Sequence, residues 1–245
     1  MIRGIVLCLM SMVTTTQTWA SEPSVLRIVT SEYPPFEYSE KGRITGKDTD
    51  TVRDVVIAMG FEPDIQLLPW IRAENQAQRG EADLIYSLTY SDQRNLHYYF
   101  TDPISEVRDV FFVHKDAGIQ WQHLDDLVDL KIGVSASYSY APVFMEWLEL
   151  SGVRVTRVSH EQPELTSLKM LAYRRIDAFI CERSVCDHLI SQHSGLLPEL
   201  TNLQALPKSV GEARPFRAAF SRLAPNAEAL RDAFNQTLME LRSGS

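Results

Sequence analysis

The side chains best suited to hold a small anion lie close together in the sequence. Ser87 and Thr89 place hydroxyl groups directly after an apolar run, and Arg94 follows in a short helix that Ser91 is placed to cap. Backbone N–H groups, hydroxyls and a guanidinium are the donors that recognise a carboxylate, the guanidinium through two parallel hydrogen bonds. This stretch predicts a carboxylate site, although an ion pair of Arg94 with Asp102 or another acid is the simpler alternative.

Aromatic residues follow two other apolar runs and are able to hold the rest of such a ligand. Tyr33 and Phe36 flank a pair of prolines that stiffens the chain, and Trp70 stands two residues before Arg72. Aromatic rings stack on flat or cationic groups, and Arg72 is able to reach a carboxylate. The alternative is that these rings cover the core and that Arg72 is an ordinary surface residue.

A second group of hydroxyls lies between residues 135 and 140, where Tyr138 and Ser139 are the candidates for ligand contact. Glu182 ends an apolar run further along the chain. Hydroxyls at a helix start and an acid at a strand end suit an ammonium group or the remainder of a carboxylate. Glu182 also fits the role of an ordinary helix-start acid, since carboxylates stabilise first turns.

The sequence lacks the motifs of common enzymes. It contains no Gly-x-Gly-x-x-Gly, phosphate loop, His-Glu-x-x-His or Gly-x-Ser-x-Gly, and its six histidines are scattered. Two acid pairs, Asp125 with Asp126 and Asp48 with Asp50, are typical of solvated faces and helix caps. The cysteines and histidines of residues 181–193 fit no standard zinc spacing. We therefore expect no catalytic residue, no metal site and no cofactor.

Short apolar runs that alternate with amphipathic stretches must position these side chains. Such alternation is typical of strand–helix–strand units around a parallel sheet. The expected strands are 25–30, 65–68, 82–88, 131–134, 153–158, 177–181 and 216–221, and the expected helices are 50–59, 70–79, 141–150, 165–173, 185–192 and 227–241. Asp48 or Thr49 is placed to cap the first helix and Gly60 to end it. Two such sets, joined by an extended piece at 107–114, predict an α/β protein of two lobes with a ligand cleft between them.

The first twenty residues have the form of an export signal. Arg3 precedes a short apolar stretch, and small residues end at Ala20, where a signal peptidase would cut. The stretch is too short to span a bilayer, which needs ~20 apolar residues. A buried N-terminal strand or helix is the alternative, but a polar stretch follows at once. We expect a periplasmic protein that begins at Ser21.

The net charge and the cysteines indicate which partners and which cellular compartment suit the protein. The chain has 24 Lys and Arg against 32 Asp and Glu, so loss of Arg3 leaves a net charge of about −9 (23 minus 32). This acidity argues against nucleic acid and anionic membranes as partners. No later stretch is apolar enough for stable insertion into a membrane. Cys181 and Cys186 are able to pair in an oxidising compartment, provided that the chain turns between them.

Several short motifs follow one another along the chain. They are Tyr-Pro-Pro-Phe at 33–36, Gly-x-Asp-x-Asp at 46–50, Gly-Glu-Ala-Asp at 80–83, Ser-Leu-Thr at 87–89, Phe-Thr-Asp-Pro at 100–103, Lys-Ile-Gly-Val at 131–134 and Arg-Ile-Asp-Ala at 175–178. Together with Arg94, this ordered set resembles the family 3 extracellular solute-binding proteins, which are the amino-acid-binding components of ABC importers. The resemblance covers essentially the whole mature chain.

The resemblance implies a type II periplasmic-binding-protein fold, in which two lobes are joined by two hinge crossings near 104–108 and 205–210. It divides the chain into a signal peptide, lobe 1, lobe 2 and a return to lobe 1, at 1–20, 21–106, 107–207 and 208–245. Hinge closure would bury a small ligand for delivery to the membrane subunits of an ABC importer. The protein is expected to act as a monomer.

The resemblance also assigns roles to individual residues. Arg94 matches the family's carboxylate-binding arginine, beside the hydroxyl and backbone positions of Ser87 and Thr89. Trp70 and Tyr33 match the aromatic positions that sandwich the ligand side chain. The remaining matches are Ser139, as a second-lobe contact to the carboxylate, and Glu182, as the acid that receives the α-ammonium.

Some residues depart from the family pattern and keep other ligands and functions open. Basic-amino-acid binders carry an acid where Thr30 stands, so lysine and arginine are disfavoured as ligands. Tyr138 and Tyr140 would re-line the pocket, which leaves room for a different carboxylate. Cyclohexadienyl dehydratases are similar to these binding proteins, so an enzyme with Glu182 as general acid is one alternative. A solute-sensing module is another.

Overall fold

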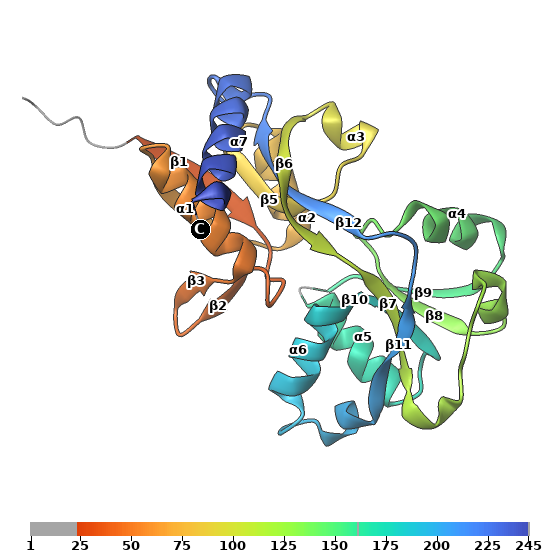
Figure 1. The fold of residues 1–245 in the computed structure, drawn as a ribbon. Coiled ribbons are helices and arrows are strands. Elements are labelled where there is room, and N and C mark those ends of the chain that lie inside the picture. The colour runs from red at the N-terminus through yellow and green to blue at the C-terminus, as the bar shows by residue number, and fades with distance from the viewer. Residues whose placement is uncertain (1–23, 161, 245) are drawn as a thin grey trace, which may run out of the picture.

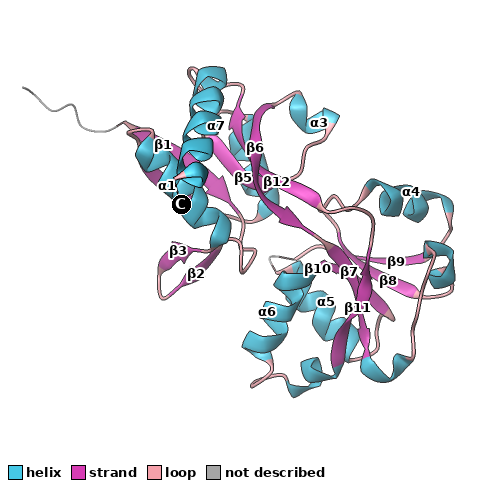
Figure 2. Ribbon diagram, viewed as in Figure 1, coloured by secondary structure: helices cyan, strands magenta, loops and turns pink. Residues whose placement is uncertain are grey.

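The computed structural model describes residues 24–160 and 162–244, so the expected export signal lies outside the described residues. The described chain forms two lobes, each built on a five-stranded sheet with helices on its faces (Figures 1 and 2). This confirms the two-lobed α/β fold predicted from the sequence. No helix within the described ranges is long and apolar enough to cross a membrane.

The first lobe contains a sheet of strand order β4-β1-β5-β12-β6. Its strands are β1 Val25–Thr30, β4 Glu62–Leu67, β5 Leu84–Leu88, β6 Tyr98–Val107 and β12 Arg214–Ser221. Its helices are α1 Lys47–Ala58, α2 Trp70–Gln78, α3 Asp92–Asn95 and α7 Ala227–Ser243, and a small hairpin pairs β2 Tyr38–Glu40 with β3 Arg43–Thr45. The neighbours β4, β1 and β5 are parallel, whereas β12 is antiparallel to both β5 and β6.

Alternating apolar side chains give this sheet a core on each face. Ile28 packs in the cluster that holds α1 and α7, and its neighbour Val29 packs in the cluster that holds α2. The same alternation separates Phe220 from Ala219 on β12. Because successive side chains of a strand point to opposite faces, helices on both sides are needed to cover the sheet.

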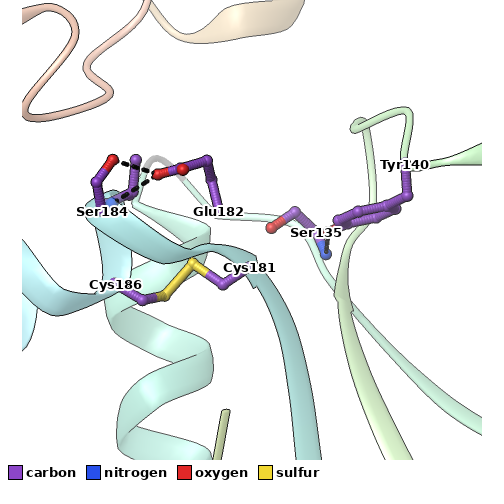
Figure 3. Close-up of a disulfide and its surroundings, with 7 residues drawn as sticks. Ser135, Tyr140, Cys181, Glu182, Ser184 and Cys186 are labelled. Carbon is purple, nitrogen blue, oxygen red and sulfur yellow. Dashed lines mark hydrogen bonds between the residues drawn. A yellow bond between two sulfur atoms is a disulfide. The ribbon is translucent and has the colours of Figure 1, made fainter. Parts of the chain in front are cut away.

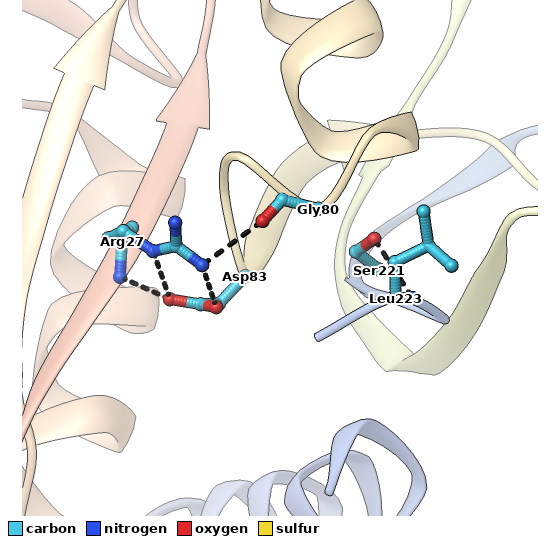
Figure 4. Close-up of polar contacts among 5 residues, drawn as sticks. All are labelled: Arg27, Gly80, Asp83, Ser221 and Leu223. Atoms are coloured by element: carbon cyan, nitrogen blue, oxygen red, sulfur yellow. Dashed lines mark hydrogen bonds and ion pairs between the residues drawn. The ribbon is translucent and has the colours of Figure 1, made fainter. Parts of the chain in front are cut away.

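An ion pair with a half-exposed arginine ties β1 to the residue before β5 (Figure 4). The backbone N–H and Nε of Arg27 donate to Oδ2 of Asp83 at 2.9 and 3.0 Å, and Nη2 donates to Oδ1 at 2.7 Å. Nη2 also reaches the carbonyl oxygen of Gly80 at 3.1 Å. Gly80 has φ +72°, and a Cβ there would lie 2.9 Å from Cβ of Leu223, so the turn needs glycine. These contacts fix the two parallel strands whose carboxyl ends carry the site.

The second lobe contains a sheet of strand order β11-β7-β10-β8-β9. Its strands are β7 Asp109–His114, β8 Lys131–Ser135, β9 Arg154–Val158, β10 Ala178–Glu182 and β11 Leu203–Ser209. Its helices are α4 Pro142–Leu150, α5 Pro163–Ala172 and α6 Arg183–His193, with short 3-10 turns at Lys115–Ala117, Leu124–Leu127 and Pro198–Asn202. Residues of α5 and α6 pack against one face and residues of α4 against the other.

The chain passes between the lobes twice, and both passages lie beside each other (Figure 1). The first joins β6 to β7 through Arg108, and the second joins β11 to β12 through residues 210–213. Two extended connections between otherwise separate sheets are the arrangement that permits a hinge.

Two of the strands that the sequence pattern missed, β6 and β11, have a common physical feature. β6 contains Pro103 and β11 contains Pro207, and both strands lie at an edge of their sheet. Proline lacks the N–H group that a central strand needs, so a proline argues against a strand in a sequence. An edge strand tolerates proline, because its outer side has no neighbouring strand to bond.

The predicted cap of the first helix is wrong. The helix begins at Lys47 with Gly46 as N-cap, and backbone N–H groups of residues 47–49 donate to the carbonyl oxygens of Pro35 and Phe36. Gly46 has φ +123°, and a Cβ there would lie 2.3 Å from the carbonyl oxygen of Phe36. The loop that follows β1 therefore caps this helix, and the side chain of Asp48 is directed to other partners.

Candidate functional site

A cavity of about 60 Å³ lies between the lobes, where the carboxyl ends of β1 and β5 face the second sheet. Both lobes contribute to its lining, which consists of Ser31, Tyr33, Glu37, Trp70, Ser87, Leu88, Thr89 and Arg94 from the first lobe, Asp109 and Ser137 to Tyr140 from the second, and Arg214 and Phe216 from β12. Seven of the residues proposed from the sequence lie together here: Tyr33, Trp70, Ser87, Thr89, Arg94, Tyr138 and Ser139.

Arg94 is held in place by its own lobe. Its Nε donates to Oε1 of Glu74 at 3.0 Å, and its Nη1 donates to the carbonyl oxygen and Oγ1 of Thr89 at 3.1 and 3.2 Å. The guanidinium carbon lies 5.5 Å from the centre of the Trp70 ring. Ser91 caps the short helix by accepting from the backbone N–H of Arg94, as predicted. These contacts hold the arginine in one geometry and leave its Nη2 available to a carboxylate.

Ser87 contacts two buried acids, Glu37, which also lines the cavity, and Asp48. Its Oγ lies 2.6 Å from Oε2 of Glu37 and 2.9 Å from Oδ2 of Asp48, and Oγ of Ser105 donates to the same Oδ2 at 2.8 Å. Ser87 has φ +61°, a left-handed conformation that costs a non-glycine residue free energy. Asp48 is fully buried, so the expectation that this acid pair forms a solvated face or a cap is wrong for Asp48.

The surroundings of these acids disfavour their charged forms. Burial raises the pKa of Glu37 well above its ordinary value, and the charge of Asp48 adds to this effect, while the bond from Ser87 opposes it. Burial likewise raises the pKa of Asp48, against the bonds from Ser105 and Ser87. Neither acid forms an ion pair with a Lys or Arg of the described residues.

Tyrosine rings form much of the second-lobe wall. Tyr138 meets Tyr33 of the first lobe edge to face, with ring centres 5.9 Å apart. The hydroxyl of Tyr138 donates to Glu164, a buried acid on α5. The hydroxyl of Tyr140 accepts from the backbone N–H of Ser135 at 2.8 Å (Figure 3). The two added tyrosines thus re-line the cavity with aromatic surface.

An ion pair between the two sheets closes one side of the cavity. Nη2 of Arg214, at the start of β12, donates to Oδ2 of Asp109, at the start of β7, at 2.6 Å. Nη1 of Arg214 donates to the carbonyl oxygen of Ser139 at 2.6 Å. Burial raises the pKa of Asp109, while Arg214 opposes that shift. The pair therefore joins the hinge to the second-lobe loop.

Three residues proposed from the sequence lie outside the lining of this cavity. Phe36 is buried and stacks on Tyr33 with ring centres 5.9 Å apart, and Arg72 is exposed on α2. Glu182 caps α6, where its Oε2 accepts from the backbone N–H of Val185 at 2.9 Å and from the hydroxyl of Ser184 (Figure 3). These positions match the alternatives considered from the sequence, which were a core aromatic for Phe36, a surface residue for Arg72 and a helix-start acid for Glu182.

Cys181 and Cys186 form a disulfide, with Cα atoms 6.4 Å apart (Figure 3). The strand-to-helix turn at Glu182 supplies the change of direction that so short a loop requires. Both sulfur-bearing residues are buried, so the bridge packs within the second lobe. Among the described residues, no group of His, Cys, Asp and Glu is arranged to hold a metal ion.

Sequence reasoning missed several residues of the lining, among them Glu37, Asp109 and Arg214. Asp109 directly precedes the apolar run Val110 to Val113. An acid at the end of an apolar strand could have marked it as a candidate site residue. Glu37 directly follows Tyr-Pro-Pro-Phe, but its contact with Ser87 joins residues 50 positions apart. Arg214 reaches Asp109 across 105 positions. Such contacts depend on the packing of distant segments.

With this geometry in view, comparison with known proteins shows the family. Residues 26–245 match the family described as "Bacterial extracellular solute-binding proteins, family 3". The chain belongs to this family. Membership agrees with the order of motifs in the sequence and with two sheets that face each other across a lined cavity.

Two relatives of this family 3 protein come from Bacillus subtilis (strain 168). The "Probable amino-acid-binding protein YxeM" is 27% identical over 166 residues, which cover 67% of this chain and 61% of the relative. The "Arginine-binding extracellular protein ArtP" is 28% identical over 105 residues, 42% of this chain and 40% of the relative. The matches thus span about three fifths and two fifths of the length of these relatives.

Solved structures show the same fold at low sequence identity. An ancestral arginine-binding protein bound to arginine has a TM-score of 0.75 and 19% identity, with 91% of this chain and 94% of that chain covered. A histidine kinase sensor domain with similarity to periplasmic binding proteins has a TM-score of 0.74 and 20% identity, with 90% and 91% covered. At this identity the likeness establishes the fold of this family 3 protein and not its ligand.

Proposed function

We propose that this family 3 protein binds a small solute with a carboxylate and an ammonium group, most simply an amino acid, in the cavity between its lobes. The observation that carries the proposal is Arg94, which is braced by Glu74 and Thr89 and lines an interlobe cavity rich in hydroxyls. A fixed guanidinium recognises a carboxylate at little cost in side-chain ordering. The two relatives from Bacillus subtilis, named as a probable amino-acid-binding protein and an arginine-binding protein, support this ligand class.

The site supplies partners for the carboxylate and for the side chain of such a ligand. Arg94, Ser87 and Thr89 hold the carboxylate from the first lobe, and Ser139 completes its cage from the second. Trp70 stacks on the remainder. Because the cavity measures about 60 Å³, a ligand enters when the lobes part at the two connecting segments, and closure then buries it.

In this proposal the protein works in the periplasm as a monomer that delivers its ligand to the membrane subunits of an ABC importer. Family membership and the predicted export signal support this setting. The chain acts as a carrier and not as an enzyme. The acid that a dehydratase would use, Glu182, is engaged by Ser184 and Val185 at the start of α6 and does not line the cavity.

Isothermal titration against the twenty amino acids and a set of small carboxylates tests the proposal. We expect one-to-one binding of at least one amino acid, and a rise in melting temperature with its concentration, because a ligand that binds only the folded state stabilises it. A folded protein that binds none of them overturns the proposal. Incubation with prephenate or arogenate addresses the enzyme directly, since product formation that is lost in Glu182→Gln would replace the carrier function.

A further inference from the structure

The buried acids behind Ser87 form a chain of hydrogen bonds that two charged carboxylates cannot satisfy. A serine hydroxyl has one proton to donate, and an ionised carboxylate only accepts. Oγ of Ser87 nevertheless lies within hydrogen-bond distance of both Glu37 Oε2, at 2.6 Å, and Asp48 Oδ2, at 2.9 Å. One of the two acids must therefore be protonated, so that its carboxyl group donates to the oxygen of Ser87.

The other contacts show which acid holds that proton. Oδ2 of Asp48 also accepts from Ser105 at 2.8 Å, so this oxygen has two hydroxyl donors, while Oδ1 of Asp48 has no hydrogen-bond partner among the described residues. The side chain of Glu37 has a hydrogen bond only to Ser87 among the described residues, and Glu37 is 1% exposed. The arrangement that puts the negative charge on the oxygen with two donors is a protonated Glu37 that donates to Ser87, while Ser87 donates to Asp48.

Glu37 stands where a ligand's cationic group would meet it. It lines the interlobe cavity together with Arg94, so the cavity offers a guanidinium for a carboxylate and a carboxyl group for an ammonium. Glu182, which the family resemblance assigns to the ammonium, lines a different and wider hollow. The titratable and charged groups around Glu37 are Tyr33 on its own loop, Lys47 and Asp48 on α1, Tyr86 on β5, Arg94 on α3, Asp109 on β7 and Arg214 on β12.

None of these cations already neutralises Glu37. Arg94 is bound to Glu74, and Arg214 is bound to Asp109. Lys47 lies over the ring of Phe36. A ligand ammonium that enters the cavity is therefore the positive charge able to pair with this acid.

We propose that Glu37 is protonated in the free protein and receives the ligand's ammonium group as a carboxylate, so that binding releases one proton to solvent. This inference rests on the proposed function, because it assigns a residue to the ammonium of that ligand. In the bound state Glu37 pairs with the ammonium and accepts from Ser87, while Ser105 remains bonded to Asp48. The protein thus prefers cationic amines over neutral analogues, and its affinity for amino acids rises with pH.

Glu37→Gln is the matched variant, because an amide donates to Ser87 as a protonated carboxyl does but cannot ionise. The variant should fold with its network intact. We expect it to bind the amino acids found in the titration panel about 10- to 100-fold more weakly, the worth of a charge-assisted hydrogen bond. Binding of the same acids without the amino group should change less than about twofold. Glu32→Gln, an exposed acid of the same loop, serves as control.

Titrations at about pH 6 in phosphate and in Tris count the protons released, since the two buffers differ in heat of ionisation. The wild type should release close to one proton per amino acid bound, and Glu37→Gln none. Amino acids that bind Glu37→Gln as tightly as the wild type, or binding that is lost in Glu182→Gln instead, would overturn the assignment of the ammonium to Glu37.

The proton itself is measurable without any ligand. Infrared spectra of the free protein at neutral pH should contain the carbonyl stretch of a protonated carboxyl that disappears in Glu37→Gln and persists in Glu164→Gln. Identical spectra of the wild type and Glu37→Gln would overturn the buried proton. If neither the amino acids nor their deaminated forms bind, the proposed function and the ammonium assignment both fail. The infrared spectra then still show whether Glu37 is protonated in the free protein.

Discussion

The two walls of the cavity differ in how firmly their side chains are held in place by hydrogen bonds within their own lobe. On the first lobe, Arg94 is braced by Glu74 and Thr89, and Ser87 is bonded to Glu37 and Asp48. On the second lobe, the lining comes from Asp109 and from one loop, residues 137–140, which contacts Tyr33 and Arg214 of other elements. A preorganised wall spends little free energy on ordering side chains, so we expect the ligand to dock on the first lobe and the second lobe to close over it.

Substitution of Arg94 should have the largest effect on binding. Arg94→Ala removes the guanidinium that holds the carboxylate and leaves the half-buried Glu74 without its partner. We expect the Kd for amino acids to rise about 100- to 1,000-fold, as when one member of a desolvated charge pair is removed. Arg72→Ala is the matched control, because Arg72 is exposed and outside the cavity. Equal losses in both variants would show that the first wall is not the docking surface.

The ion pair between the lobes should have the next largest effect. Asp109→Asn leaves Arg214 without its counter-charge at a position where Asp109 is 3% exposed and Arg214 is 15% exposed. Removal of one member of such a pair destabilises a protein by about 3 kcal/mol, measured by urea unfolding. The double variant with Arg214→Gln should recover part of that loss. Glu106→Gln, an acid of the exposed pair with Arg108, should leave the unfolding free energy unchanged.

The acid behind the second wall should make stability depend on pH. Burial raises the pKa of Glu164 from 4.5 to about 7, and its Oε1 has no hydrogen-bond partner. Because the folded pKa exceeds the unfolded one, this group's contribution to stability is complete below about pH 4.5 and is lost as the pH rises to about 7. The loss is on the order of 3 kcal/mol.

Glu164→Gln isolates this contribution, because Glu37 and Asp48 have raised pKa values as well. The unfolding free energy of the wild type should fall relative to that of the variant between pH 4.5 and 7. A difference that stays constant over this range would show that Glu164 ionises as freely when folded as when unfolded. The second wall would then be less enclosed than its contacts with Tyr138 indicate.

The sequence predicted the first wall better than the second for a physical reason. Ser87, Thr89 and Arg94 lie within eight residues of each other, so local spacing already places them at one strand end. Strand and helix positions were also predictable, because apolar periodicity is local. Glu37 and Arg214 could not be placed in this way, since their partners lie 50 and 105 positions away. The role of Asp48 was hidden because the cap it was expected to form is made by the carbonyls of another loop.

The disulfide offers the smallest expected effect and a test of how rigid the second lobe is by itself. A bridge that closes so short a loop stabilises the folded state by about 2 kcal/mol in the chain-entropy model. Replacement of Cys181 and Cys186 by Ala should lower the urea midpoint accordingly. The bridge spans the turn at Glu182, which lies outside the cavity, and the first wall contains neither cysteine. Amino-acid affinity should therefore change less than about threefold, and a much larger loss would show that β10 and α6 shape the second wall.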